Sequence, residues 1–218
     1  HLSSKKALQA ALQMAQIFPH IDFRREVTIG HLMLDVSSKS GVLAKVNPPI
    51  RPREDVEFLW EKLLEGKVDW VVSDHACCRH ETKAAKNALG NIWLAKAGFG
   101  GTEYLLPSLV SEGTRRGLSL NRIAALTSAN AARRFGLNSK GDIAPGFDAD
   151  LALVDPRERW TIRAEGSEST QGYTPFEGIE LSARVKATFL RGALVCENAK
   201  VMGKPRGRYL HRPTHGNS

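Results

Sequence analysis

The feature that most constrains the fold of this 218-residue chain is a change of pattern near residue 140. Before it, short β-branched runs such as residues 68–73 alternate with segments whose apolar residues recur every three or four positions. After it, only strand-like runs remain, separated by Gly, Pro, Asp and Asn. Alternation of strand and helix favours a parallel α/β unit, whereas strands alone favour an antiparallel sheet. We therefore predict two units, residues 1–139 and residues 140–218.

Helix signals are clearest in the first unit. Ser3 or Ser4 can cap a helix that ends before Pro19, and Pro52 suits the first turn of a helix that ends before Gly66. Further helices are expected at residues 102–112, 119–128 and 130–135, and strands at residues 25–34 and 68–73. In the second unit we expect strands at residues 150–155, 160–164, 183–191 and 194–197.

Composition narrows the class of protein. With 42% hydrophobic and 25% charged residues the sequence is of ordinary globular type, and it shows neither a membrane span nor a secretory leader. We expect a cytoplasmic protein that has no membrane partner. Much of the net charge of +8 lies in a basic tail at residues 199–218, without the interleaved aromatic residues of a nucleic-acid surface, so we expect no nucleic-acid partner. Three cysteines, two of them adjacent, do not suggest a disulfide framework.

The first residue is a candidate metal ligand. The chain opens with His1 instead of Met and runs directly into a helix signal, so we expect it to be cut from a longer protein. His1 would then lie at the end of a strand whose body is missing, where a neutral imidazole suits zinc. The alternative is that His1 is a disordered or tag-derived residue.

Asp74 and His75 follow directly on the apolar run at residues 68–73. The carboxyl ends of strands are where α/β proteins place ligands and catalytic groups. A carboxylate there can bind a metal and accept a proton from metal-bound water. The alternative is that Asp74 caps a turn and His75 lies on the surface.

Two other motifs carry weaker signals. The glycine-rich residues 98–102 precede a helix, so they can either present backbone N–H groups to an anion or form a tight turn. Cys77, Cys78 and His80 suggest a zinc knuckle, but no second Cys or His pair follows at a suitable spacing. We expect small, partly buried thiols there.

Several ordered motifs together resemble the cyclic amidohydrolases, which include dihydroorotase, allantoinase and hydantoinase (dihydropyrimidinase). They are Lys-Val-Asn-Pro-Pro-Ile-Arg at residues 45–51, Asp-Trp-Val-Val-Ser-Asp-His-Ala at 69–76, and Lys-Gly-Asp-Ile-Ala-Pro-Gly-Phe-Asp-Ala-Asp at 140–150. Residues 174–178 and 205–208 are also similar to that family's C-terminal section, so the resemblance extends over nearly the whole chain.

The resemblance implies an α/β fold: the C-terminal part of a metal-dependent (β/α)8 TIM barrel plus part of a small antiparallel β-sandwich. Family members usually hold two divalent metal ions, commonly zinc, with a His-x-His pair, a carboxylated lysine, two further histidines and an aspartate. His1 matches the last histidine ligand and Asp74 matches the aspartate, and the other ligands would lie upstream. The resemblance does not assign His31 as a metal ligand. We expect its side chain to pack in the core or to hydrogen-bond to groups behind the ligands.

The reaction implied by the resemblance is attack of a metal-bridging hydroxide on a ring carbonyl. Asp74 would be the catalytic residue that accepts the proton and returns it to the leaving nitrogen. Asn47 and Gly100 match loop positions that contact the substrate ring in relatives. The ring stays open among allantoin, hydantoin-like rings and dihydroorotate. Residues 45–51 and 99–103 resemble dihydroorotases and hydantoinases, whereas Cys77 and Cys78 stand where dihydroorotases usually carry Pro-His.

Two hypotheses of function follow. The first is a hydrolase of small cyclic amides or ureides, whose isolated chain is inactive because it lacks the N-terminal part of the barrel. The second is a non-catalytic assembly module of the same superfamily. In either case the resemblance implies a homo-oligomer of the parent protein.

Overall fold

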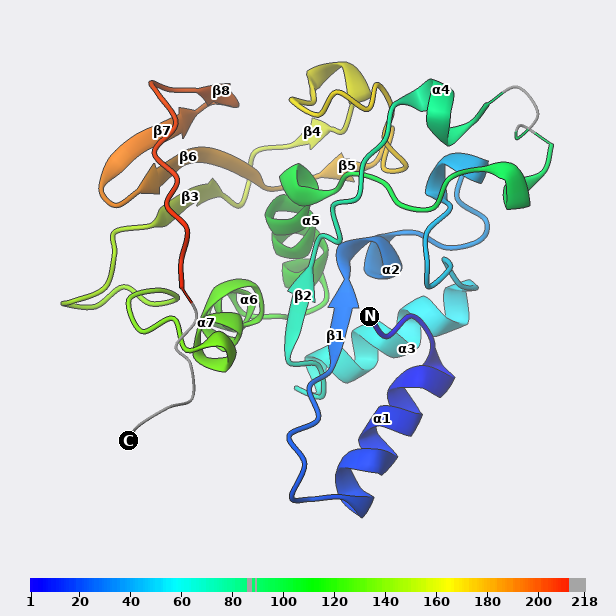
Figure 1. The fold of residues 1–218 in the computed structure, drawn as a ribbon, viewed down its shortest axis with the longest axis horizontal. Helices are drawn as coiled ribbons and strands as arrows, with labels where there is room; N and C mark the ends of the chain where they lie inside the picture. The colour runs from blue at the N-terminus through cyan, green and yellow to red at the C-terminus, as the bar shows by residue number, and fades with distance from the viewer. Residues whose placement is uncertain (86–87, 89, 212–218) are drawn as a thin grey trace.

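The structure of the protein, a computed structural model, describes residues 1–85, 88 and 90–211 (Figure 1). None of the helices in this described part is long and apolar enough to cross a membrane. The first half of the chain places two parallel strands among helices, and the second half is built mainly from antiparallel strands.

The two parallel strands are β1 (Glu26–Thr28) and β2 (Trp70–Val72), paired in the register Val27 to Val71. In Figure 1 they lie side by side at the centre of the molecule, with helices on both sides. The helices of this region are α1 (Lys5–Ile17), α2 (Ile29–Met33), α3 (Arg53–Leu64), α4 (His80–Lys83), α5 (Thr102–Arg115), α6 (Leu120–Ala124) and α7 (Asn130–Phe135).

Local sequence signals account for the two clearest helices. In α1, the Ser4 hydroxyl accepts a hydrogen bond from the Ala7 N–H at 3.2 Å, and the helix ends before Pro19. In α3, Pro52 occupies the N-cap, and Gly66 adopts a φ of +77° just beyond the last turn. The predictions for these two helices are confirmed.

Two predictions of secondary structure are wrong. Residues 25–34 do not form one strand, because the Thr28 hydroxyl accepts a hydrogen bond from the His31 N–H and so caps α2 after only three strand residues. The helix predicted at residues 119–128 is α-helical only over α6, because a π-helical turn follows Ala124 and leads into α7. The helix predicted at residues 130–135 is confirmed as α7, which has no side-chain cap, since the Asn130 side chain donates to the Asp69 carbonyl at 2.7 Å.

The second half contains the antiparallel sheet that its strand-only pattern predicts. Its order is β3-β6-β7-β8, and a separate pair of short strands, β4 and β5, lies beside α5. The bounds are β3 (Leu151–Asp155), β4 (Trp160–Thr161), β5 (Glu180–Leu181), β6 (Arg184–Leu190), β7 (Ala193–Glu197) and β8 (Lys200–Val201). The strand predicted at residues 160–164 is therefore shorter than expected.

One hydrophobic core joins the two halves. It includes Leu59 and Trp60 of α3 and Leu109 of α5, and it continues into Ile162 and Phe176 of the second half. All five side chains are fully buried. The boundary between residues 139 and 140 stays a prediction, and any division there would have to cut across this core.

Candidate functional site

His1 and Asp74 meet beside the two parallel strands. Asp74 lies two residues beyond β2, and His1 lies against β1, where the Leu2 N–H donates to the Glu26 carbonyl at 2.8 Å. The His1 Nε2 atom is 3.3 Å from an Asp74 carboxylate oxygen, and each side chain is a little over one quarter exposed. The structure therefore brings together the two candidate ligands that are 73 positions apart in the sequence.

The third member of this cluster is Glu26, which the sequence did not single out. One of its carboxylate oxygens is 2.5 Å from His1 Nδ1, and the other accepts a hydrogen bond from the Trp70 indole at 2.7 Å. Glu26 can accept the proton of the tautomer protonated at Nδ1, in which Nε2, on the Asp74 side, is the nitrogen with a lone pair for a metal ion. A carboxylate on the far nitrogen is the usual way to orient a metal-binding histidine.

The backbone at Asp74 has an uncommon conformation. Its φ is +49°, in the left-handed region that few residues other than glycine adopt and that Asp tolerates better than most. This turn directs the chain from β2 into the loop that carries His75, whose ring nitrogen accepts from the Gly101 and Thr102 N–H groups at 3.3 and 3.4 Å. Backbone conformations of this kind cluster at functional sites.

The glycine-rich residues 98–102 form a tight turn whose N–H groups have protein partners. The Gly100 N–H donates to the Gln171 side chain at 2.8 Å, and the next two N–H groups point to His75. The anion-binding interpretation of this loop is therefore wrong. Gly98 needs to be glycine, because its φ is +96° and a Cβ would lie 2.6 Å from the Ala76 carbonyl oxygen.

Asn47 lies on an exposed loop that is tied to the same end of the strands. The carbonyl of the next residue, Pro48, accepts a hydrogen bond from His31 Nε2 at 2.9 Å. The other ring nitrogen of His31 is 2.7 Å from the Thr28 hydroxyl at the end of β1. His31 is 2% exposed, so it packs and hydrogen-bonds as the sequence predicts, and burial lowers its pKa below the ordinary value.

The remaining candidate ligands are dispersed. In the described part of the chain, no group of three or more His, Cys, Asp and Glu side chains is arranged to hold a metal ion. Cys78 is partly buried as expected, whereas the expectation of a partly buried thiol is wrong for Cys77, which is exposed, and neither residue forms a disulfide. His1 and Asp74 therefore offer one nitrogen and one carboxylate, which suit zinc by type but make an incomplete set.

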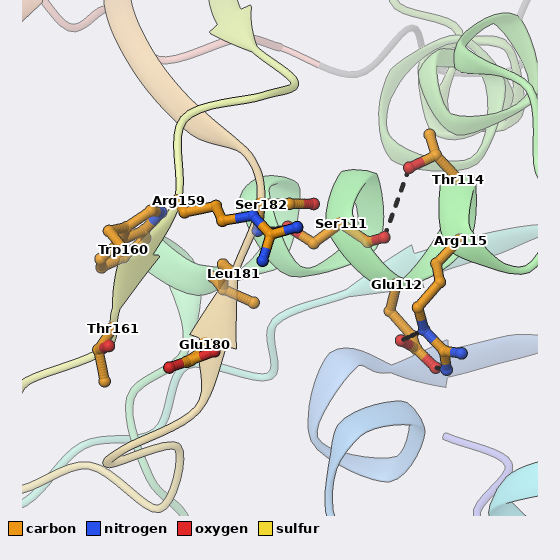
Figure 2. Close-up of a pocket in the computed structure, with 10 residues that line it drawn as sticks. All are labelled: Ser111, Glu112, Thr114, Arg115, Arg159, Trp160, Thr161, Glu180, Leu181 and Ser182. Carbon is orange, nitrogen blue, oxygen red and sulfur yellow. Dashed lines mark hydrogen bonds and ion pairs between the residues drawn. The ribbon is translucent and has the colours of Figure 1, made fainter.

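A surface cleft lies away from this cluster. It has a volume of about 750 Å³ and opens between α5 and the short strands β4 and β5, and Figure 2 shows the ten residues that line it. Among them are Glu112 and Arg115, paired with each other, and Glu180 on the opposite side. None of the ten is a predicted site residue, so the cleft does not mark the His1 and Asp74 cluster.

Sequence comparison supports the resemblance. Allantoinase from Rubrobacter xylanophilus is 44% identical to this chain over 171 residues, which cover 78% of this chain and 37% of that protein. Allantoinase from Salmonella gallinarum is 35% identical over 198 residues, which cover 89% of this chain and 42% of that protein. The chain thus spans less than half the length of these curated relatives.

Comparison with solved structures also supports a fold shared with this group of enzymes. The D-hydantoinase (dihydropyrimidinase) from Thermus sp. superposes with a TM-score of 0.84 at 31% identity, over 94% of this chain and 45% of that one. A second D-hydantoinase structure superposes over 100% of this chain with a TM-score of 0.88 at 27% identity. The amidohydrolase family model matches residues 3–195. The chain therefore belongs to the amidohydrolase family.

Proposed function

We propose that this chain is the C-terminal part of a hydrolase that opens the amide C–N bond of a small cyclic ureide or amide. The observation that carries the proposal is the pair of His1 and Asp74, 3.3 Å apart beside the parallel strands, in a chain that is 44% identical to an allantoinase. The complete protein would close the barrel around β1 and β2 and complete the antiparallel sandwich. It would also assemble as a homo-oligomer.

The residues present fit part of a zinc site. His1 is oriented by Glu26, and its Nε2 atom lies 3.3 Å from the Asp74 carboxylate, so one nitrogen and one oxygen of the types that zinc accepts lie together. The remaining ligands would come from the N-terminal part of the barrel. When bound, divalent ions of this kind supply Lewis-acid activation of water and of the ring carbonyl.

Asp74 is the proposed catalytic residue. As a partly exposed carboxylate at the site, it can accept a proton from the attacking water and return it to the nitrogen that leaves. The interaction of His1 with Glu26 holds the imidazole in one orientation beside it. These are the two steps that this chain's own residues would perform, proton transfer and orientation.

The ring would bind between the Asn47 and Gly100 loops. Asn47 is exposed and so is available to a ligand. Gly100 is buried and its N–H donates to Gln171, which leaves its carbonyl as the group that would contact the ring. A side chain at this position would meet both Gln171 and His75 at 3.0 Å, so glycine keeps the approach short.

Allantoin is the substrate that we favour. The two curated relatives described above are allantoinases, and Cys77 and Cys78 replace the Pro-His of dihydroorotases. Hydantoin-like rings are the second choice, supported by the structural similarity to hydantoinases. Dihydroorotate is the least favoured of the three rings.

The test uses two preparations, this chain alone and this chain together with the N-terminal part of the barrel. We expect the complete protein to bind about two zinc ions and to open allantoin faster than hydantoin, dihydrouracil or dihydroorotate. We expect the 218-residue chain alone to open none of them. Ring opening by the isolated chain with zinc would overturn the proposal of an inactive fragment. A complete protein that opens no ring would overturn the hydrolase and favour an assembly module.

A further inference from the structure

Lys83 is the least expected buried residue of the molecule. It ends the short helix α4, and its side chain is 0% exposed. Its ammonium group donates one hydrogen bond to the Lys45 carbonyl and another to the Gly98 carbonyl, each at 2.6 Å. Lysine is rarely buried this deeply without a carboxylate partner, and here two backbone carbonyls take that place.

The two carbonyls belong to the two loops that would bind the ring. Lys45 lies two residues before Asn47, and Gly98 lies two residues before Gly100. The loops also bond directly, because the Gly98 N–H donates to the Lys45 carbonyl at 3.0 Å. A single ammonium group therefore joins both loops at their bases, on the buried side.

An apolar side chain could fill this position at a lower cost in free energy than a lysine. Taking an ammonium group out of water costs free energy, and burial lowers the pKa of Lys83 to about 8, against an opposing effect of the Cys78 thiol. Two short hydrogen bonds to carbonyls can offset much of that cost only while both loops hold their positions. Burial of the Lys83 ammonium group is therefore stable only at the loop spacing that lets both carbonyls accept its hydrogen bonds.

We propose that Lys83 is a positioning residue that fixes the distance between the Asn47 and Gly100 loops and thereby sets the affinity for the substrate ring. The inference rests on the proposed function, because it assigns a role in binding the same ring. It goes further by naming a residue that would touch neither metal nor substrate.

The test compares Lys83→Met with Lys96→Met in the complete protein. Methionine keeps most of the buried volume and removes the donors, and Lys96 offers the same charge change at an exposed position of the neighbouring segment. In Lys83→Met we expect KM for allantoin, or for the ring opened fastest, to rise at least tenfold while kcat changes less than threefold. Hydrogen exchange at the Gly98 amide should accelerate relative to the Val71 amide of β2. Lys96→Met should match the wild type in both measurements.

Two kinetic outcomes decide against the inference. An unchanged KM overturns it, whether or not exchange at Gly98 changes, and so does an equal rise of KM in Lys96→Met. If the wild-type protein opens no ring, the proposed function fails first, and exchange at Gly98 still reports whether Lys83 joins the loops.

A Lys83→Met variant that does not fold leaves a second measurement. Cys78 and Lys45 are the titratable groups whose charges act on Lys83. The measurement is made in a Cys78→Ser background, which removes the thiol as a titrating neighbour. Between pH 7 and pH 9 the protection of the Gly98 amide, relative to Val71, should fall in part, because the neutral amine keeps two N–H donors but its hydrogen bonds to the two carbonyls are no longer strengthened by charge. Constant relative protection would overturn the inference.

Discussion

The parallel strands and the four-stranded antiparallel sheet differ in how deeply they are buried. In β1 and β2, Val27 and Val71 are 2% exposed or less. In the sheet β3-β6-β7-β8, Ala187 is the one buried residue among the described strand positions, and Leu153 and Val201 are more than half exposed. The parallel region therefore carries its own covering helices, whereas the sheet shows apolar side chains that another layer would cover. Stability and chemistry should both depend mainly on the first region.

The largest expected contrast concerns activity. Asp74→Asn removes the proposed proton acceptor of the first region, so turnover by the complete protein should fall by about 10² to 10⁴-fold. Asp142→Asn makes the same change at an exposed carboxylate of the second region and should leave turnover unchanged. Steady-state kinetics with allantoin measures both. Equal losses in the two variants would contradict the assignment of Asp74.

The next contrast concerns stability. Trp60 is fully buried, and its indole donates to the Leu32 carbonyl at 2.8 Å, so Trp60→Ala should lower the free energy of unfolding by about 3–5 kcal/mol. Leu153 of β3 is 53% exposed, so Leu153→Ala should cost under about 1 kcal/mol. Urea unfolding of both variants tests the comparison, and similar losses would show that the sheet is as tightly packed as the parallel region.

A smaller effect is expected on metal affinity. The two carboxylate oxygens of Glu26 accept from His1 and from Trp70, whereas the side chain in Glu26→Gln has a single acceptor oxygen. This substitution should weaken zinc binding by about 10 to 100-fold. Glu180→Gln, at an exposed position of β5, is the matched change in the second region and should have no effect. Competition with a chelator measures zinc affinity directly. Equal affinities in the wild type and Glu26→Gln would exclude the orienting role of Glu26.

The smallest expected difference between the two regions is in how the free energy of unfolding depends on pH. Burial lowers the pKa of His31 in the folded protein below the ordinary value of 6.5. Between these two pKa values the unfolded chain binds more protons than the folded one. The free energy of unfolding should therefore fall as pH drops below 6.5, by at most about 1.4 kcal/mol per pH unit for this group. In the second region, a hydrogen bond from Lys140 lowers the pKa of Asp148, whose contribution is lost only below about pH 3.8.

The same titration has a matched control. His31→Gln should flatten the loss of stability between pH 6.5 and 5.5, and His20→Gln, at an exposed position, should not. Urea unfolding at several pH values gives the slope for each variant. A slope that persists in His31→Gln would assign the pH dependence to another group.

The sequence predicted those elements that local signals determine. Ser4 and Pro19 bound α1, and Pro52 and Gly66 bound α3, because capping and chain-breaking act within a few residues. The run at residues 25–34 was predicted wrongly, because its β-branched residues resemble a strand while the Thr28 hydroxyl starts a helix. Asn130 begins α7 as predicted, but its side chain bonds to Asp69, a partner 61 positions away that no local pattern indicates.

The candidate site was predicted only in part, for a similar reason. Asp74 follows a visible strand, and His1 was identified by resemblance, so both could be named. Glu26 could not be named, because its partners His1 and Trp70 are distant in the sequence. Lys83 stands in the polar run Arg-His-Glu-Thr-Lys, which resembles a solvated surface, and no local signal shows that its ammonium group is buried.

The contacts of residues 98–101 with the second half of the chain bear on how this family can diversify. Gln171 accepts the Gly100 N–H, and the Phe176 ring packs edge-on against Phe99 with 5.8 Å between centroids. In a chimera that takes residues 140–218 from another family member, the proposed ring-binding loop would therefore contact residues that come from a different protein. Recombination between relatives should preserve function only when both segments are inherited from the same parent.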